Sequence, residues 1–136
     1  MRNKLVVLFA VLALVASSLA CSFGDPTLDN VRTAKDQDGN QPSSVFSAGD
    51  TIYVVTDLSN GAVGNVVNSK WYAVNVEGLE ANLMFDEADI NIEEDGFNGT
   101  VYFYYPPPDG GWPVGSYRVE VYFNSVLVDT VEFTVE

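Results

Sequence analysis

Apolar and polar side chains alternate along the last quarter of the chain. Between Tyr117 and Phe123 the odd-numbered residues are apolar or aromatic, and the even-numbered residues carry polar groups. A period of two is typical of a half-buried β-strand. A turn follows at Asn124 and Ser125. The next apolar set is Leu127, Val131, Phe133 and Val135. The pattern predicts a terminal β-hairpin, which needs a wider sheet and a second layer to be stable in water.

Other extended segments precede this hairpin, and each is bounded by residues that favour turns. They are rich in β-branched and aromatic side chains, which favour strands. The expected strands are residues 43–46, 51–58, 69–76 and 98–105, with a shorter acidic edge strand and its approach at 83–85 and 88–92. Turns recur about every ten residues and the mature chain shows no helical period, so we predict an all-β sandwich or barrel of about seven antiparallel strands.

The first 20 residues have the organisation of a secretory signal. Arg2 and Lys4 give a positive start, residues 5–16 form an apolar run, and small residues lead to Cys21. The apolar run is shorter than the roughly 20 residues that a membrane-spanning helix needs. We therefore expect residues 1–20 to be a signal-peptide helix that is removed from the mature protein.

The sequence Ser-Leu-Ala-Cys at 18–21 resembles the lipobox of bacterial lipoproteins, although Ser stands where Leu is commoner. The resemblance implies cleavage before Cys21 and a diacylglycerol on its thiol; an ordinary signal peptide is the alternative. Several acyl chains give stable anchoring, because each buried CH₂ contributes about 0.8 kcal/mol. We expect an exported protein, held at the cell membrane or cell surface by lipid on Cys21.

The charge of the chain is strongly negative. It has 6 Lys and Arg against 19 Asp and Glu, a net charge of −13. Loss of Arg2 and Lys4 with the signal leaves four cations against 19 acids, a net charge of −15. Such a domain repels nucleic acid, so no nucleic-acid partner is expected. The acids either keep the surface soluble or attract cations and basic partners.

The residue types needed for common catalytic sites are missing. The chain has no His, and Cys21 is its one Cys, so intrachain disulfides, nucleophile–base pairs and Cys/His zinc sites are excluded. The acidic run at 86–95 leaves carboxylate catalysis as an alternative, but a domain of this size offers little room for a cleft. We expect no enzymatic activity and no cofactor, and interpret the run as charge that protects an edge strand. Binding of a divalent cation is the alternative.

A second acidic segment resembles the start of a calcium loop. Asp36, Asp38 and Asn40 have the right spacing, but Gln41 stands where Gly is needed and Ser47 where Glu is needed. A solvated turn is the expectation, and a calcium site the alternative.

Tyrosines are the most distinctive candidate for a binding surface. If the apolar residues of each strand point inward, several tyrosines point outward and could share one sheet face. These residues are Tyr53, Tyr72, Tyr102, Tyr104 and Tyr122. Such a face could stack on sugar or on a partner protein. Cross-strand aromatic pairing, which stabilises a sheet without binding anything, is the alternative.

The positions of two aromatic residues indicate a particular kind of sandwich. Trp71 lies on the third main strand, and Tyr117 lies at the start of the penultimate strand. This placement of the two residues resembles that in immunoglobulin-like sandwiches. The turn Trp112-Pro113-Val114-Gly115-Ser116-Tyr117 resembles the ending of bacterial extracytoplasmic immunoglobulin-like lipoproteins. In these, the Tyr packs against the preceding loop. The resemblance implies a cell-surface context and carries no general biochemical activity.

Together these features predict three parts of the chain. Residues 1–20 are the signal peptide, residues 21–42 are the lipidated Cys and a polar tether with a candidate first edge strand at 28–35, and residues 43–136 are the immunoglobulin-like domain. The expected function is a non-enzymatic protein-interaction or structural module that binds another envelope protein. A carbohydrate-binding module that uses the surface tyrosines is the alternative.

Overall fold

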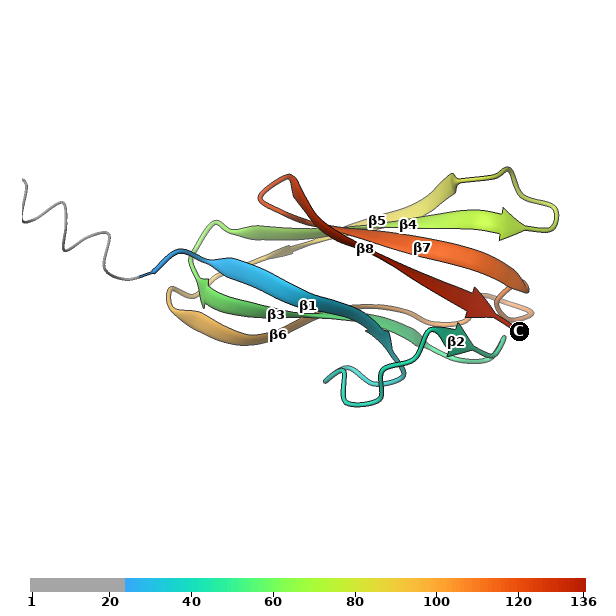
Figure 1. The fold of residues 1–136 in the computed structure, drawn as a ribbon, viewed down its shortest axis with the longest axis horizontal. Helices are drawn as coiled ribbons and strands as arrows, with labels where there is room; N and C mark the ends of the chain where they lie inside the picture. The colour runs from blue at the N-terminus through green and yellow to red at the C-terminus, as the bar shows by residue number, and fades with distance from the viewer. Residues whose placement is uncertain (1–23) are drawn as a thin grey trace, which may run out of the picture.

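The computed structural model of the protein describes residues 24–136 and shows an all-β sandwich (Figure 1). The strands are β1 (Thr27–Ala34), β2 (Val45–Phe46), β3 (Ile52–Gly61), β4 (Val66–Val76), β5 (Leu83–Asn91), β6 (Phe97–Tyr105), β7 (Gly115–Phe123) and β8 (Val126–Val135). One sheet has the order β1-β3-β6 and the other has the order β2-β8-β7-β4-β5. The predicted immunoglobulin-like sandwich is confirmed. Cys21 and the predicted signal-peptide helix lie outside the described residues.

The described chain has eight strands, where about seven were expected. The short strand β2 pairs in parallel with β8, whereas every other pairing within residues 24–136 is antiparallel. The candidate strand at 28–35 is present as β1 and pairs with β3, so the sheet begins at Thr27, within the segment interpreted as the tether. The two segments at 83–85 and 88–92 form one strand, β5, along the edge of β4.

The core lies between the inner faces of the two sheets. Trp71, Phe46 and Phe133 are almost fully buried there. The Trp71 and Phe133 rings have their centroids 6.2 Å apart, and Tyr117 stacks on Phe133 at 5.0 Å. The Trp71 indole N–H donates to the buried Ser69 hydroxyl at 3.0 Å, so this polar group is satisfied. Burial of each such large side chain contributes about 1.5–3 kcal/mol.

The start of β8 departs from the predicted alternation. The pairing of β7 with β8 shifts register between Val121 and Tyr122, where β8 carries one extra residue. A bulge of this kind breaks the period of two. Val131 is partly buried and Phe133 and Val135 are buried as expected, but Leu127 is 49% exposed. The inclusion of Leu127 in the inward set was therefore wrong.

The Pro-Gly turn before β7 has a defined structural role. The Tyr117 hydroxyl donates to the Pro113 carbonyl oxygen at 2.6 Å, the arrangement known as a tyrosine corner in immunoglobulin-like domains. Gly115 has a φ of 156°, and a Cβ there would lie 2.5 Å from the Asn75 carbonyl oxygen. Only glycine lets the chain pass this close to β4. Trp112 is buried at the end of the core, and its indole N–H donates to the Asp50 carbonyl oxygen.

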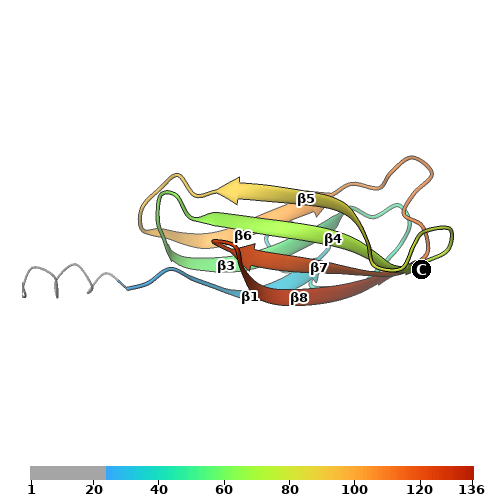
Figure 2. The same cartoon turned by 90° about the horizontal axis from the view of Figure 1, so that it is seen from above.

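The two ends of the sandwich differ. The described chain enters at the end that carries the β3–β4, β5–β6 and β7–β8 turns, and the C-terminus lies at the opposite end (Figures 1 and 2). The loop that carries Trp112 is also at this opposite end. Within residues 24–136, no helix is long and apolar enough to cross a membrane.

The tyrosine corner can be tested by replacing Tyr117 with Phe, which removes the hydroxyl and keeps the ring. We expect the free energy of unfolding at pH 7 to fall by about 1 kcal/mol, the usual net contribution of one hydrogen bond. Urea titration measures this change, and its m-value should not change. Tyr104→Phe is the matched control, since its ring is exposed and its expected change is below about 0.5 kcal/mol.

The effect of Tyr117→Phe on the free energy of unfolding is expected to depend on pH. Burial raises the pKa of Tyr117. Its contribution to stability is therefore fully present below the unfolded-state pKa of about 10 and is lost as the pH rises through the folded-state pKa. The stability difference between wild type and Tyr117→Phe should shrink above about pH 10. A difference that stays constant to about pH 11 would contradict this account.

Candidate functional site

The five candidate tyrosines all lie away from the core, but they do not share one face. Tyr53 on β3 and Tyr102 and Tyr104 on β6 belong to the three-stranded sheet. Tyr72 on β4 and Tyr122 on β7 belong to the five-stranded sheet. Outward-facing residues of the two layers point to opposite sides of a sandwich. The expectation of one shared tyrosine face is therefore replaced by two separate groups.

The tyrosines of the five-stranded sheet already contact charged side chains of their own sheet. The Arg118 guanidinium lies 4.1 Å from the centroid of the Tyr72 ring, and the Lys70 ammonium lies 4.8 Å from that of Tyr122. The Tyr122 hydroxyl donates to Glu120 at 3.0 Å, and this hydrogen bond raises the pKa of Tyr122. These cation–π and hydrogen-bond contacts stabilise the sheet and cover the rings. This group has the character of cross-strand pairing rather than of a binding surface.

The tyrosines of the three-stranded sheet form a more exposed group, which we call the tyrosine patch (Tyr53, Tyr102 and Tyr104). Tyr104 lies directly across from Tyr53 in the β3–β6 ladder, and Val55 lies across from Tyr102. The ring centroids are 6.1 to 6.4 Å apart. Tyr104 is 60% exposed and Tyr102 is 37% exposed. The rings are tilted by 34° to 55° to one another, so the patch is uneven rather than flat.

The tyrosine patch continues around β6 onto an open side of the sandwich. Strands β5 and β6 are edge strands of different sheets, and they lie on the same side of the molecule (Figure 2). On the other side, β1 contacts β8 and closes the gap between the sheets. Between β5 and β6 there is a groove of about 820 Å³, which we call the edge groove. Tyr102 and Tyr104 form part of its lining, so the two features are one continuous surface.

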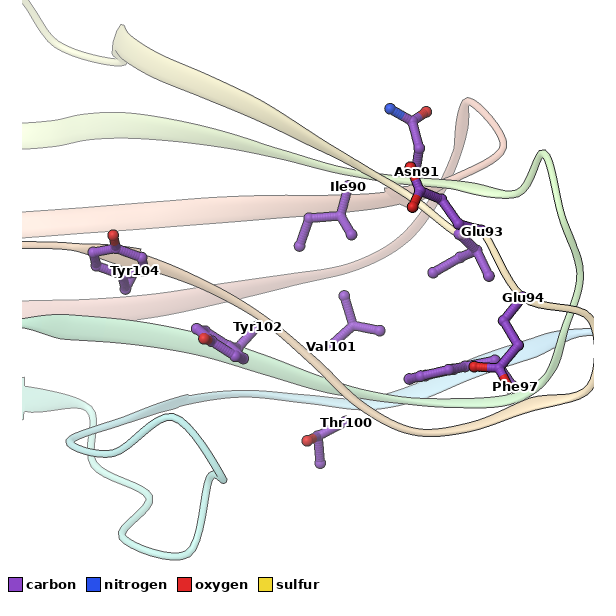
Figure 3. Close-up of a pocket in the computed structure, with 10 residues that line it drawn as sticks. Ile90, Asn91, Glu93, Glu94, Phe97, Thr100, Val101, Tyr102 and Tyr104 are labelled. Carbon is purple, nitrogen blue, oxygen red and sulfur yellow. The ribbon is translucent and has the colours of Figure 1, made fainter.

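Apolar side chains form the floor of the edge groove. Ile90 from β5 faces Val101 from β6 across it, and Phe97 lies toward one end (Figure 3). Glu93 and Glu94, from the β5–β6 turn, lie at that same end. Both glutamates are exposed, and within residues 24–136 neither takes part in an ion pair. The groove therefore combines an apolar floor with a negative rim, which suits a ligand that is both apolar and cationic.

The groove is limited to one half of the open side because aromatic rings close the other half. Phe85 on β5 contacts Tyr105 on β6 with ring centroids 5.7 Å apart, and Trp112 packs against both. The three-proline run after Tyr105 then ends β6. The accessible part of the β6 edge therefore lies between this aromatic cluster and the acidic turn.

The candidate calcium residues form a turn that is stabilised by its own hydrogen bonds. The Asp36 carboxylate accepts hydrogen bonds from the backbone N–H groups of Asn40 and Gln41, at 3.0 and 2.8 Å. Arg32 donates to the carbonyl oxygens of Asp38 and Gly39 and so binds the turn to β1. Among the described residues, no group of three or more acidic, His or Cys side chains is arranged to hold a metal ion. These contacts support the solvated turn.

Sequence reasoning found the tyrosines but missed the floor of the groove. Ile90 and Val101 belong to strands that pair with β4 and β3, and nothing local shows that these strands face each other. One available signal was the composition of 97–105, which has no charged residue or proline although the other segments around it are acidic. That contrast distinguishes β6 from the usual solvent-facing edge strand.

Comparisons with known proteins identify the fold only. No protein-family model matches the chain, and no curated protein sequence matches it. A β-glucosidase from Erythrobacter marinus is similar in structure, with a TM-score of 0.54 and 13% identity over 82% of this chain and 15% of that one. A β-glucosidase from Listeria innocua in complex with gluconolactone gives a TM-score of 0.51 and 15% identity, over 82% of this chain and 16% of that one.

A third similar structure is an alkylpurine DNA glycosylase, AlkC from Pseudomonas fluorescens, bound to DNA containing an abasic site analog. The TM-score is 0.50 and the identity 13%, over 83% of this chain and 31% of that one. The chain thus spans less than a third of the length of each of these enzymes. At such identities the likeness concerns the sandwich itself.

The metal question has a direct test. Because the Asp36 carboxylate is already used by backbone N–H groups, we expect the melting temperature to be the same in EDTA and in millimolar Ca²⁺. Asp36→Ala should lower the free energy of unfolding by about 1 kcal/mol, since two hydrogen bonds are lost at an exposed turn. Asp38→Ala is the control and should change neither value. A rise in melting temperature with Ca²⁺ that Asp38→Ala abolishes would establish a calcium site instead.

Proposed function

We propose that the protein is a non-enzymatic interaction module that is displayed at the cell envelope by a lipid on Cys21 and binds another envelope protein. The observation that carries the proposal is the continuous surface formed by the tyrosine patch and the edge groove. Exposed aromatic side chains that adjoin an apolar groove with polar residues at its rim are a common feature of interaction sites. Tyrosine suits such a role because it brings a large contact area and loses little conformational entropy on binding.

The shape of the surface favours a protein partner over a sugar. A sugar ring stacks on a flat and accessible aromatic face, whereas the three rings of the tyrosine patch are tilted against one another. The edge groove adds an apolar floor and an unpaired strand edge, and an extended polypeptide can pair with the edge while its side chains fill the groove.

The position of the N-terminal end supports display from a membrane. Only a few residues separate Cys21 from Thr27, the first residue of β1. A lipid on Cys21 would therefore hold the adjacent end of the sandwich near the membrane. The edge groove begins at this same end, where the β5–β6 turn lies, and extends along the side of the sandwich between β5 and β6, so a partner would approach from the side (Figure 2).

The binding surface can be tested by site-specific photo-crosslinking in cells. A photoreactive phenylalanine analogue at position 104 should give a discrete crosslinked protein adduct, because Tyr104 lies on the proposed surface and is 60% exposed. The same analogue at position 122, on the opposite sheet, is the matched control and should give none. Adducts of equal strength at both positions, or none at either, would contradict the proposal. Glycan-array binding that Tyr102→Ala and Tyr104→Ala abolish would support the carbohydrate module instead.

The anchor can be tested separately with Cys21→Ser, which removes the thiol that the lipid would modify. We expect the variant either to leave the membrane fraction or to accumulate with its signal peptide attached. Fractionation and mass spectrometry of the mature N-terminus measure both outcomes. Unchanged processing and membrane attachment would show that Cys21 is not the anchor.

A further inference from the structure

The sheet edges of this sandwich are not equally protected against pairing with another strand. Within residues 24–136 four strands lie at sheet edges, namely β1, β2, β5 and β6. Exposed edges present free N–H and C=O groups, and soluble proteins usually block them with charge, proline, bulges or short length. The four edges therefore differ in how readily they can pair with a strand from another molecule.

Three of the edges carry a recognisable block. Strand β1 has a register irregularity between Asp29 and Arg32, and it contacts β8 across the layers. Strand β2 has two residues and pairs only with Thr134 and Val135 of β8, and the rest of the β8 edge carries the bulge near Val128 and the acids Asp129 and Glu132. Strand β5 carries the exposed acids Asp86, Glu87 and Asp89. Irregularity, short length and charge each disfavour addition of a further strand.

Strand β6 has a register irregularity only at its start, between Phe97 and Gly99, and is otherwise free of these blocks. Its sequence, Phe-Asn-Gly-Thr-Val-Tyr-Phe-Tyr-Tyr, contains no charged residue and no proline. From Gly99 to Tyr105 its pairing with β3 has no register shift, so this part of the edge is regular. The edge groove lies immediately beside this edge, so it leaves space for a partner strand to approach β6. In a domain with so many acids, an uncharged edge next to an apolar groove is an exception.

We infer that β6 accepts a β-strand from a partner, and that this strand alternates aliphatic and basic residues. The inference rests on the proposed protein-interaction function and names the partner's chemistry. A strand added beside β6 extends the three-stranded sheet, so its side chains alternate between the inner and outer faces. Each face of the added strand then meets a different surface of this protein.

The inner face of the added strand would enter the edge groove. Residues opposite Val101 and Phe103 point the same way as these two, toward the apolar floor that includes Ile90. Aliphatic side chains fit there because they remove apolar surface from water and need no hydrogen-bond partner. The regular and accessible edge from Gly99 to Tyr104 is six residues long, so the added strand would span roughly 20 Å.

The outer face of the added strand would lie beside the tyrosine patch. Residues opposite Tyr102 and Tyr104 point outward with them, where Lys or Arg can contact the aromatic rings. Glu93 and Glu94 lie at one end of the groove and attract the same cations. Self-association through two β6 edges is disfavoured, because each copy brings the same acids and a strongly negative net charge.

Fluorescence anisotropy with defined peptides tests this inference on the mature protein, purified in detergent. The probe is a nine-residue labelled peptide of alternating Val and Arg. One comparison peptide has N-methyl groups on alternate backbone nitrogens, and another has Glu in place of Arg. We expect binding to be about tenfold weaker or worse for both, since one loses strand hydrogen bonds and the other the charge match. Hydrogen exchange should slow in residues 97–105 when the first peptide binds.

Two double variants test the acidic rim with the same change in net charge. Glu93→Gln with Glu94→Gln should weaken binding of the Val/Arg peptide about tenfold. Glu77→Gln with Glu80→Gln, at the exposed β4–β5 turn on the opposite end, is the control and should change it less than about twofold. Thr100→Lys, which places a charge on the β6 edge, should also weaken binding.

Equal binding of the N-methylated peptide would overturn strand addition, and equal binding of the Glu peptide would overturn the basic partner. Dimerisation of the protein that protects residues 97–105 would replace the partner by a second copy. A crosslinked adduct at position 104 without any peptide binding would overturn this inference and leave the proposed function standing. Absence of the crosslinked adduct and of peptide binding would overturn both this inference and the proposed function.

Discussion

The whole structure depends on packing two sheets against one another through Trp71, Phe133 and Tyr117. All three rings belong to the five-stranded sheet and pack on one another, and Trp71 contacts Tyr105 of the three-stranded sheet with ring centroids 5.8 Å apart. The chain has no disulfide to hold the layers together, so apolar and aromatic burial must do so. The tyrosine corner and the close approach at Gly115 fix where β7 enters this core. Every surface feature is placed by this packing.

A sandwich that is not closed into a barrel has sheets with unpaired edge strands. In this protein the gap between the two sheets is closed on one side and partly open on the other. On one side, contact of β1 with β8 closes the space between the sheets. On the other side, Phe85 and Tyr105 close one half and leave the edge groove in the other. The tyrosine patch adjoins that opening because Tyr102 and Tyr104 belong to the strand that borders it. The proposed binding surface is thus a consequence of how the layers meet.

The charges of the described chain reinforce this arrangement. Its cations contact groups within the domain: Arg32 binds the 36–41 turn and Asp57, Lys35 lies near Asp50, and Lys70 and Arg118 cover tyrosine rings. Most of the acids have no such partner among residues 24–136 and face solvent. The outer field of the domain is therefore negative, which favours basic partners and opposes self-association.

The sequence by itself determined most of the strands and the terminal hairpin, because alternation and turn chemistry are local properties. It did not determine that Leu127 is exposed, since one extra residue in β8 reverses the alternation there. It also could not divide the tyrosines between the sheets or bring Ile90 opposite Val101. These placements depend on which strands pair and how the layers stack, and that is decided by contacts between residues far apart in the chain.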